Sequence, residues 1–170
     1  MTNGLTIQKA DIPDIPVIQT IAYQTWPVAY GAILSRAQLD YMLANMYSEE
    51  ALRKQMESGH QFYLAVNENG PLGFASVSEE TPEIFKLNKL YVLPNIQKTG
   101  AGKGLLHAVI QYAGSKKGKR LQLQVNRHND AKNFYIKQGF RIIREADIDI
   151  GNGFFMNDFI MERLLDNTDQ

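Results

Sequence analysis

The sequence of 170 residues contains no cysteine. This absence excludes disulfide bonds, a catalytic thiolate and zinc sites that use thiolate ligands. We also expect the protein to need no metal.

Long apolar runs and an excess of charge are also missing. No stretch approaches the roughly 20 apolar residues of a membrane-spanning helix, and Met1 to Asp14 lacks the apolar core of a signal peptide. The 18 basic and 18 acidic residues balance, which argues against a general nucleic-acid or anionic-membrane surface. The one dense basic cluster, residues 116–120, is typical of a solvated helix end. We expect a soluble, cytoplasmic protein that binds neither nucleic acid nor membrane.

The length favours one domain, residues 1–170, and no repeats or low-complexity linkers divide it. Apolar periodicity predicts a strand, a helical region, three strands, a helix, a strand, a helix and two strands. The succession of strand, helix and strand over residues 84–125 implies a parallel pair inside a mixed sheet. The predicted strands are 5–10, 61–66, 72–77, 83–92, 120–125, 140–150 and 154–165.

The most informative segment is Gln97-Lys98-Thr99-Gly100-Ala101-Gly102-Lys103-Gly104, between a predicted strand and a predicted helix. A glycine-rich turn that opens a helix aims backbone N–H groups and the positive end of the helix dipole at one point, which suits a phosphate. Gly104 stands where a Walker loop needs Ser or Thr, and Leu105 replaces the third glycine of a dinucleotide fingerprint. Taken alone, the segment is either an anion-binding loop or a tight turn.

Two blocks together resemble the GNAT superfamily of acetyl-CoA-dependent N-acetyltransferases. The first block joins residues 89–94 to 97–102, and the second joins residues 123–126 to 129–131 and 134–140. The distance between them fits one helix and one strand. The resemblance implies an α/β fold with a mostly antiparallel mixed sheet, a splayed central parallel pair and flanking helices.

The resemblance also implies where coenzyme A binds. The glycine loop would hold the diphosphate through backbone amides, and the preceding strand would take the pantetheine arm as an added strand. Because relatives carry Asn where this chain has His128, the resemblance leaves open whether His128 or Asn129 faces the cofactor. The coenzyme-binding residues implied in this way are Leu90, Tyr91, Val92, Gln97, Lys98, Thr99, Gly100, Ala101, Gly102, Lys103, Asn126, Asn129, Asn133 and Lys137.

Tyr135 lies where similar enzymes place a general acid near the coenzyme sulfur. A phenol can protonate the departing thiolate. Spacing alone predicts instead that Tyr135 is an aromatic core side chain beside Phe134 and Phe140. The resemblance favours the catalytic interpretation.

The reaction also needs a general base, because an ammonium acceptor must lose a proton before it attacks the thioester. The positions where several relatives supply Glu or His hold Asn88 and Lys86. Glu83 is the closest upstream carboxylate and could act as the base directly or through an ordered water. Alternatively, Glu83 is simply a solvated residue at an exposed strand end. The further options are Asp158, His60, His107 and His128.

The acceptor should lie between the N-terminal helices and the splayed strands, where Trp26 and Tyr30 are either aromatic walls for the acceptor or core residues. We expect acetyl transfer to a primary amine of a polyamine-like small molecule or a peptide, by direct attack in a ternary complex. The alternative is a non-catalytic acyl-CoA sensor, suggested by Lys86 and Asn88. If the chain forms a homodimer, the last two strands, with Phe154, Phe155, Phe159 and Ile160, are the expected edge.

Overall fold

A seven-stranded sheet with the order β1-β2-β3-β4-β5-β7-β6 forms the centre of the computed structural model, which describes residues 4–94, 96 and 99–166. Neighbouring strands are antiparallel except β4 and β5. This confirms the predicted mixed sheet with one central parallel pair. The strands are β1 (Thr6–Ala10), β2 (Gln61–Asn67), β3 (Gly70–Glu79), β4 (Ile84–Val92), β5 (Arg120–Asn126), β6 (Arg141–Gly151) and β7 (Phe154–Leu164).

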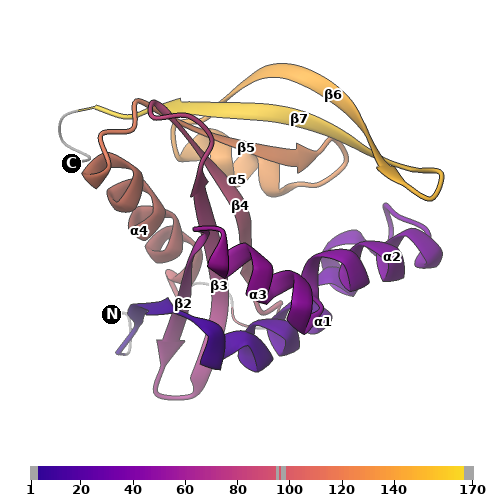
Figure 1. The fold of residues 1–170 in the computed structure, drawn as a ribbon, viewed down its shortest axis with the longest axis horizontal. Coiled ribbons are helices and arrows are strands. Elements are labelled where there is room, and N and C mark those ends of the chain that lie inside the picture. The colour runs from indigo at the N-terminus through magenta and orange to yellow at the C-terminus, as the bar shows by residue number, and fades with distance from the viewer. Residues whose placement is uncertain (1–3, 95, 97–98, 167–170) are drawn as a thin grey trace.

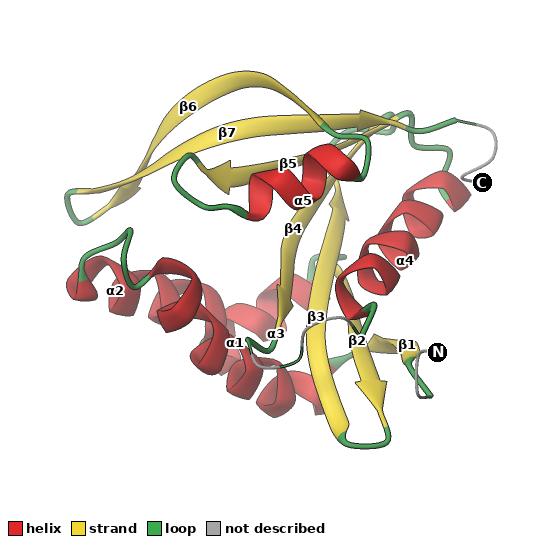
Figure 2. Ribbon diagram, turned by 180° about the vertical axis from the view of Figure 1, so that it is seen from behind, coloured by secondary structure: helices red, strands yellow, loops and turns green. Residues whose placement is uncertain are grey.

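Helices cover both faces of the sheet (Figure 2). One face carries α4 (Ala101–Ser115) and α5 (Ala131–Lys137), whose apolar side chains join a core that includes Leu105, Leu121 and Phe140. The other carries α1 (Ile15–Tyr30), α2 (Arg36–Tyr47) and α3 (Glu49–Glu57), which share a second core with β2 and β3. A short 3₁₀ turn, η1 (Ile12–Asp14), precedes α1.

The helix ends follow local chemistry. The hydroxyl of Ser35 accepts from the N–H of Gln38, and that of Ser48 accepts from the N–H of Ala51, so the two serines cap α2 and α3. Gly139 follows α5 at φ 91°, a conformation that glycine adopts without a Cβ penalty. These residues define where α2 and α3 begin and where α5 ends.

Strand β4 contains a bulge that the sequence pattern does not predict. Val77 of β3 pairs with Leu87, whereas Ser76 pairs with Lys89, so Asn88 is an extra residue in β4. Side chains of a strand alternate between its faces, and one inserted residue reverses that alternation. As a result Leu87 and Leu90 both pack toward the α4 face, although they are three residues apart.

Candidate active site

Strands β4 and β5 separate halfway along their length. They pair from Ile84 and Arg120 as far as Leu87 and Leu123, and not beyond these residues in the described part of the chain. Past this point lies a cavity of about 50 Å³, here called the split cavity. It is lined by Tyr30, Leu87, Asn88, Lys89, Leu90, Tyr91, Leu123, Gln124, Val125, Asn129, Ala131 and Tyr135. Backbone groups of β4 that would otherwise bond to β5 can therefore meet a bound ligand.

The glycine loop lies near the open end of this split. Gly100 caps α4 at φ 81°, and the N–H of Ala101 donates to Oγ1 of Thr99 at 3.3 Å. A methyl group on Gly102 would lie 3.8 Å from the ring of Phe134 and 3.9 Å from Val92. The described first turn of α4 contains no acidic residue and includes the exposed Lys103. The N-terminus of this helix of 15 residues therefore offers an anion site beside the ends of β4 and α5.

The predicted coenzyme residues divide between the split and the surface. Leu90, Tyr91 and Asn129 line the split cavity, and Asn126 lines the larger pocket described below. Asn126 and Asn129 also shape the loop after β5, since their Oδ1 atoms accept from the N–H groups of His128 and Ala131 at 2.9 Å.

Several predicted coenzyme residues lie outside the two cavities. Val92 packs against the α4-side core, and Asn133 and Lys137 are exposed on α5. His128 is exposed and is not among the described residues that line either cavity, unlike Asn129. Gln97 and Lys98 lie outside the described residues.

Tyr135 is brought into the split by α5. Its ring packs edge-on against Phe134 and Phe140, with centroids 5.3 and 5.6 Å away. Burial, helped by the nearby Tyr30, raises the pKa of the Tyr135 phenol far above its ordinary value. The phenol therefore keeps its proton at neutral pH and can donate it, or a hydrogen bond, to a developing anion.

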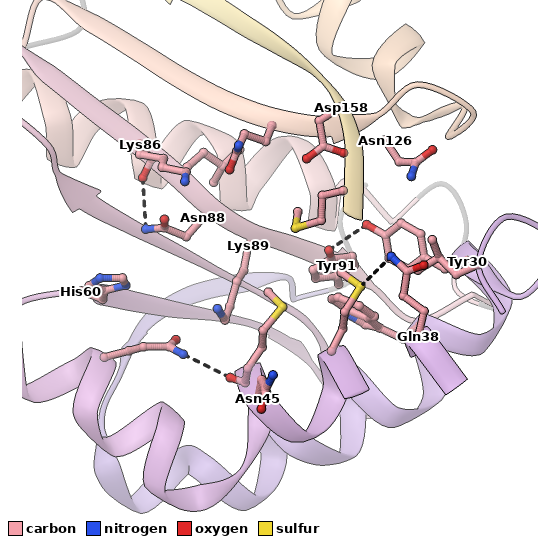
Figure 3. A pocket seen from close by; sticks show the side chains of 18 residues that line it. Tyr30, Gln38, Asn45, His60, Lys86, Asn88, Lys89, Tyr91, Asn126 and Asp158 are labelled. Atoms are coloured by element: carbon pink, nitrogen blue, oxygen red, sulfur yellow. Dashed lines mark hydrogen bonds between the residues drawn. The ribbon is translucent and has the colours of Figure 1, made fainter. Parts of the chain in front are cut away.

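A larger pocket of about 310 Å³ adjoins the split cavity (Figure 3). Both α1 and α2 contribute to its wall, with α3, β4, β5 and β7 completing it. The residues that line both cavities are Tyr30, Leu87, Asn88, Lys89, Tyr91 and Gln124. A ligand in the split and a second one in the large pocket would therefore share a wall.

Aromatic residues form one side of the large pocket. The Tyr30 and Tyr91 hydroxyls lie 2.9 Å apart in a hydrogen bond, and the Trp26 ring centroid is 4.7 Å from that of Tyr30. Trp26 is almost fully buried, so it supports the wall more than it faces solvent. The structure thus brings both predicted acceptor residues to the pocket.

Asp158 of β7 provides the carboxylate of this pocket. Its side chain is buried, and its Oδ2 atom has no hydrogen-bond partner in the described part of the chain. Burial raises the pKa of Asp158 to about 6, against the opposing effects of Arg127 and Lys86. A carboxylate with this pKa is ionised at neutral pH and is a stronger base than an exposed one.

Glu83 lies elsewhere. It is exposed just before β4, its carbonyl accepts from the N–H groups of Lys119 and Arg120, and it is not among the described residues that line either cavity. Of the histidines, His107 is exposed on α4, whereas His60 lines the large pocket. Burial and then Lys89 lower the pKa of His60, which favours the neutral ring.

Sequence reasoning missed the polar lining contributed by Gln38, Lys89 and Gln124. Gln124 alternates with buried Leu123 and Val125, so strand periodicity could have placed it on the opposite face. Lys89 had no comparable signal, because the bulge at Asn88 decides which face it occupies.

The described residues offer neither a metal site nor a membrane-spanning helix. Within the part of the chain that the structure describes, no cluster of three or more His, Asp or Glu residues is suited to a metal ion. Over the same residues, no helix has the length and apolarity needed to cross a membrane.

Comparisons with known proteins agree with this geometry. The family model of the acetyltransferase (GNAT) domain matches residues 32–156. A spermidine N(1)-acetyltransferase of Thermoplasma acidophilum is 27% identical over 166 residues, covering 94% of this chain and 97% of the relative. An uncharacterized N-acetyltransferase of Mycobacterium tuberculosis is 27% identical over 154 residues, covering 89% of this chain and 98% of the relative.

Solved structures share the fold over nearly the whole chain. The PaiA N-acetyltransferase of Thermoplasma acidophilum, solved in complex with coenzyme A, has a TM-score of 0.79 at 25% identity and covers 95% of this chain and 99% of its own. A GCN5-related N-acetyltransferase from Rhodopseudomonas palustris reaches 0.80 at 21% identity, with 95% and 96% covered. Since the family model spans most of the chain and its relatives carry the same activity in their names, the chain belongs to the GNAT family and is an acetyl-CoA-dependent N-acetyltransferase.

Proposed function

We propose that the protein transfers the acetyl group of acetyl-CoA to a primary amine by direct attack in a ternary complex. The observation that carries this proposal is the wall common to the split cavity and the large pocket, which includes Tyr30, Tyr91 and Gln124. A donor in the split and an acceptor in the pocket would meet there without an intermediate carrier. The absence of cysteine removes the thiol that an acyl-enzyme would commonly use.

Coenzyme A fits the residues around the split. The diphosphate would bind backbone N–H groups at the start of α4, from Thr99 to Lys103. The pantetheine arm would extend along β4 from Val92 toward Leu90, where β5 leaves backbone groups of β4 unpaired. Asn129 would contact the arm, and the exposed Asn133 and Lys137 would serve the nucleotide end.

The transfer needs a base, an oxyanion site and an acid. Asp158 would accept a proton from the acceptor ammonium, directly or through a water, and the free amine would attack the thioester carbonyl. The N–C bond forms as the C–S bond breaks, while a backbone N–H of β4 stabilises the oxyanion. Tyr135 would then donate its proton to the coenzyme thiolate and regain one from the nitrogen, which gives up its second proton as the amide forms, while Asp158 returns the first proton to solvent.

The acceptor in this proposal is a primary amine of a small molecule or a peptide. The name of the Thermoplasma relative makes a polyamine one candidate. Such an amine would enter the large pocket beside the Tyr30 and Tyr91 rings, where apolar and cation–π contacts are available.

Release of coenzyme A thiol tests the proposal directly. Ellman's reagent would report the coenzyme alone, because the protein has no cysteine. We expect amine-dependent release, an N-acetylated product by mass spectrometry, and intersecting lines in double-reciprocal plots. Parallel lines would contradict the ternary complex, and acetyl-CoA binding without release for any amine would favour a sensor.

A further inference from the structure

The charges that line the large pocket are unusual for a site that binds a cationic amine. Lys86 and Lys89 both line it, and Asp158 is the one carboxylate among the described lining residues. His60 adds a ring whose pKa is lowered by burial, and the remaining polar groups include neutral amides such as Asn45 and Gln124. The described lining therefore has more ammonium groups than carboxylates.

The bulge in β4 places the two lysines together. Residues three apart in a regular strand point to opposite faces of the sheet. Because Asn88 is inserted between Leu87 and Lys89, Lys86 and Lys89 both reach the large pocket. Figure 3 shows these two lysines and His60 toward one end of the pocket, and Asp158, Asn126 and Tyr30 toward the other.

Lys89 is buried without a counter-ion. Its side chain is 5% exposed, and its Nζ atom lies 5.1 Å from the ring centroid of Tyr47. Neither Lys86 nor Lys89 forms an ion pair with a carboxylate in the described part of the chain. Burial and the charge of Lys86 lower the pKa of Lys89 to about 8, so most of it is still charged at neutral pH. A buried ammonium is costly unless an anion meets it.

The phosphates of coenzyme A do not account for this pair. The glycine loop follows the far end of β4, and Lys86 lies six residues before Val92, about 20 Å along a strand. The lysines also face the large pocket on the α2 and α3 side, whereas α4 covers the opposite face. An anion beside Lys86 and Lys89 would belong to the acceptor.

We infer that the acceptor is a small amine that also carries an anionic group, a carboxylate or a phosphate, bound by Lys86 and Lys89 with its amine facing Asp158. This inference rests on the proposed acetyl transfer. Charge-assisted hydrogen bonds from the two ammonium groups would hold the anion. A polyamine would instead bring several positive charges against two lysines, with one carboxylate to balance them.

A panel of acceptors, the first four of nearly equal length, tests the inference. The purified full chain, saturated with acetyl-CoA, would be assayed for thiol release with β-alanine, 2-aminoethylphosphonate, n-propylamine, 1,3-diaminopropane and spermidine, and with the common L-amino acids. We expect the best anionic amine to exceed n-propylamine in kcat/KM about tenfold or more, since hydrogen bonds between charged groups have that strength. The carboxylate and phosphonate compounds distinguish the two anions.

Variants then assign the preference to the lysines. We expect Lys89→Met and Lys86→Met each to lower the ratio of kcat/KM for the anionic amine over n-propylamine toward one, mainly through a higher KM. Lys119→Met, at an exposed lysine outside the described pocket lining, is the matched control and should keep the ratio. Melting temperatures would verify that each variant is folded.

The possible failures are distinguishable. Preference for spermidine or 1,3-diaminopropane, with ordinary turnover, would overturn the inference and leave the proposed acetyl transfer intact. A preserved ratio in both lysine variants, or a loss of kcat with unchanged KM, would equally overturn it. Acetyl-CoA binding with no release for any amine would reject the proposed function itself.

Discussion

At the scale of single residues, the burial of Asp158 makes it the base that we favour. Its pKa of about 6 means that the unprotonated form is lost as the pH falls below that value. We expect kcat/KM of the wild type to fall on the acid side with an apparent pKa near 6. Asp158→Asn should lower kcat about 10²–10⁴-fold and remove that acid limb, because general-base catalysis contributes this much.

Glu83→Gln is the matched comparison for this variant, since it makes the same chemical change at an exposed carboxylate. We expect its pH–rate profile to follow that of the wild type. The opposite pattern, with Glu83→Gln slow and Asp158→Asn normal, would assign the base to Glu83, the closest carboxylate upstream in the sequence.

Tyr135 is the corresponding test of the general acid. Its phenol keeps its proton because burial raises its pKa, and Tyr135→Phe removes the hydroxyl while keeping the ring packed against Phe134 and Phe140. We expect kcat to fall at least about tenfold, with a small change in the calorimetric Kd for coenzyme A. Unchanged turnover on the preferred acceptor would remove Tyr135 from the mechanism.

The buried charge of Lys89 should also affect the free energy of unfolding, and this effect can be measured without a bound acceptor. Its folded pKa of about 8 lies below its ordinary value of 10.5, so between these values the unfolded chain binds a proton that the folded chain does not. The contribution of Lys89 to the free energy of unfolding therefore rises with pH across that window. Lys89→Met should raise the free energy of unfolding of the unliganded protein at pH 7 by roughly 1–3 kcal/mol.

Urea unfolding at pH 7 and at pH 10 measures this difference. The gain from Lys89→Met should shrink at the higher pH, where the wild-type lysine is mostly neutral. A gain of equal size at both pH values would mean that methionine packing, and not the buried charge, is responsible.

At the scale of elements, the succession of strands and helices along the chain, the parallel pair and the loop-to-helix junction could be predicted from the sequence. Alternating residues in β5 and the glycines between the predicted strands 140–150 and 154–165 are local signals, and the structure has a strand and a turn at these places. The bulge at Asn88 and the burial of Asp158 could not be predicted. Both depend on pairing with distant strands, which local periodicity does not record.

The loop before α4 carries the prediction for the donor. Gly100→Glu or Gly102→Glu would place a carboxylate among backbone N–H groups that we propose bind the diphosphate, and would repel it. We expect acetyl-CoA affinity to fall beyond calorimetric detection. Gly59→Glu is the control for Gly100, because Gly59 also has a positive φ, 104°, and nothing would crowd its side chain.

Thermal unfolding of the three glutamate variants separates folding from binding. Gly100→Glu and Gly59→Glu share the cost of a side chain at positive φ, so their melting temperatures should fall by similar amounts. Near-normal coenzyme affinity in either loop variant would reject the assignment of this loop to the diphosphate.

At the scale of the whole molecule, the large pocket is closed by parts of the chain that are far apart in sequence. The hairpin of β6 and β7 reaches over to α2 (Figure 1). There Nε2 of Gln38 donates to the carbonyl of Phe155 at 2.7 Å, and the Tyr41 hydroxyl donates to the carbonyl of Ile150 at 2.8 Å. Because α2 and β7 also line the pocket, these two contacts hold its opposite walls together.

Two glycines in that hairpin make this closure testable. Both have positive φ, but a methyl group on Gly151 would lie 2.7 Å from the Tyr41 hydroxyl, whereas one on Gly153 would meet nothing within 4 Å. Gly151→Ala should therefore displace Tyr41 and raise the KM for the acceptor severalfold, while the Kd for acetyl-CoA changes little because α4 lies apart from the hairpin. Gly153→Ala bears the same backbone cost without the clash and should keep the wild-type KM. Equal KM values in the two variants would show that the contact between α2 and the hairpin does not control the acceptor side.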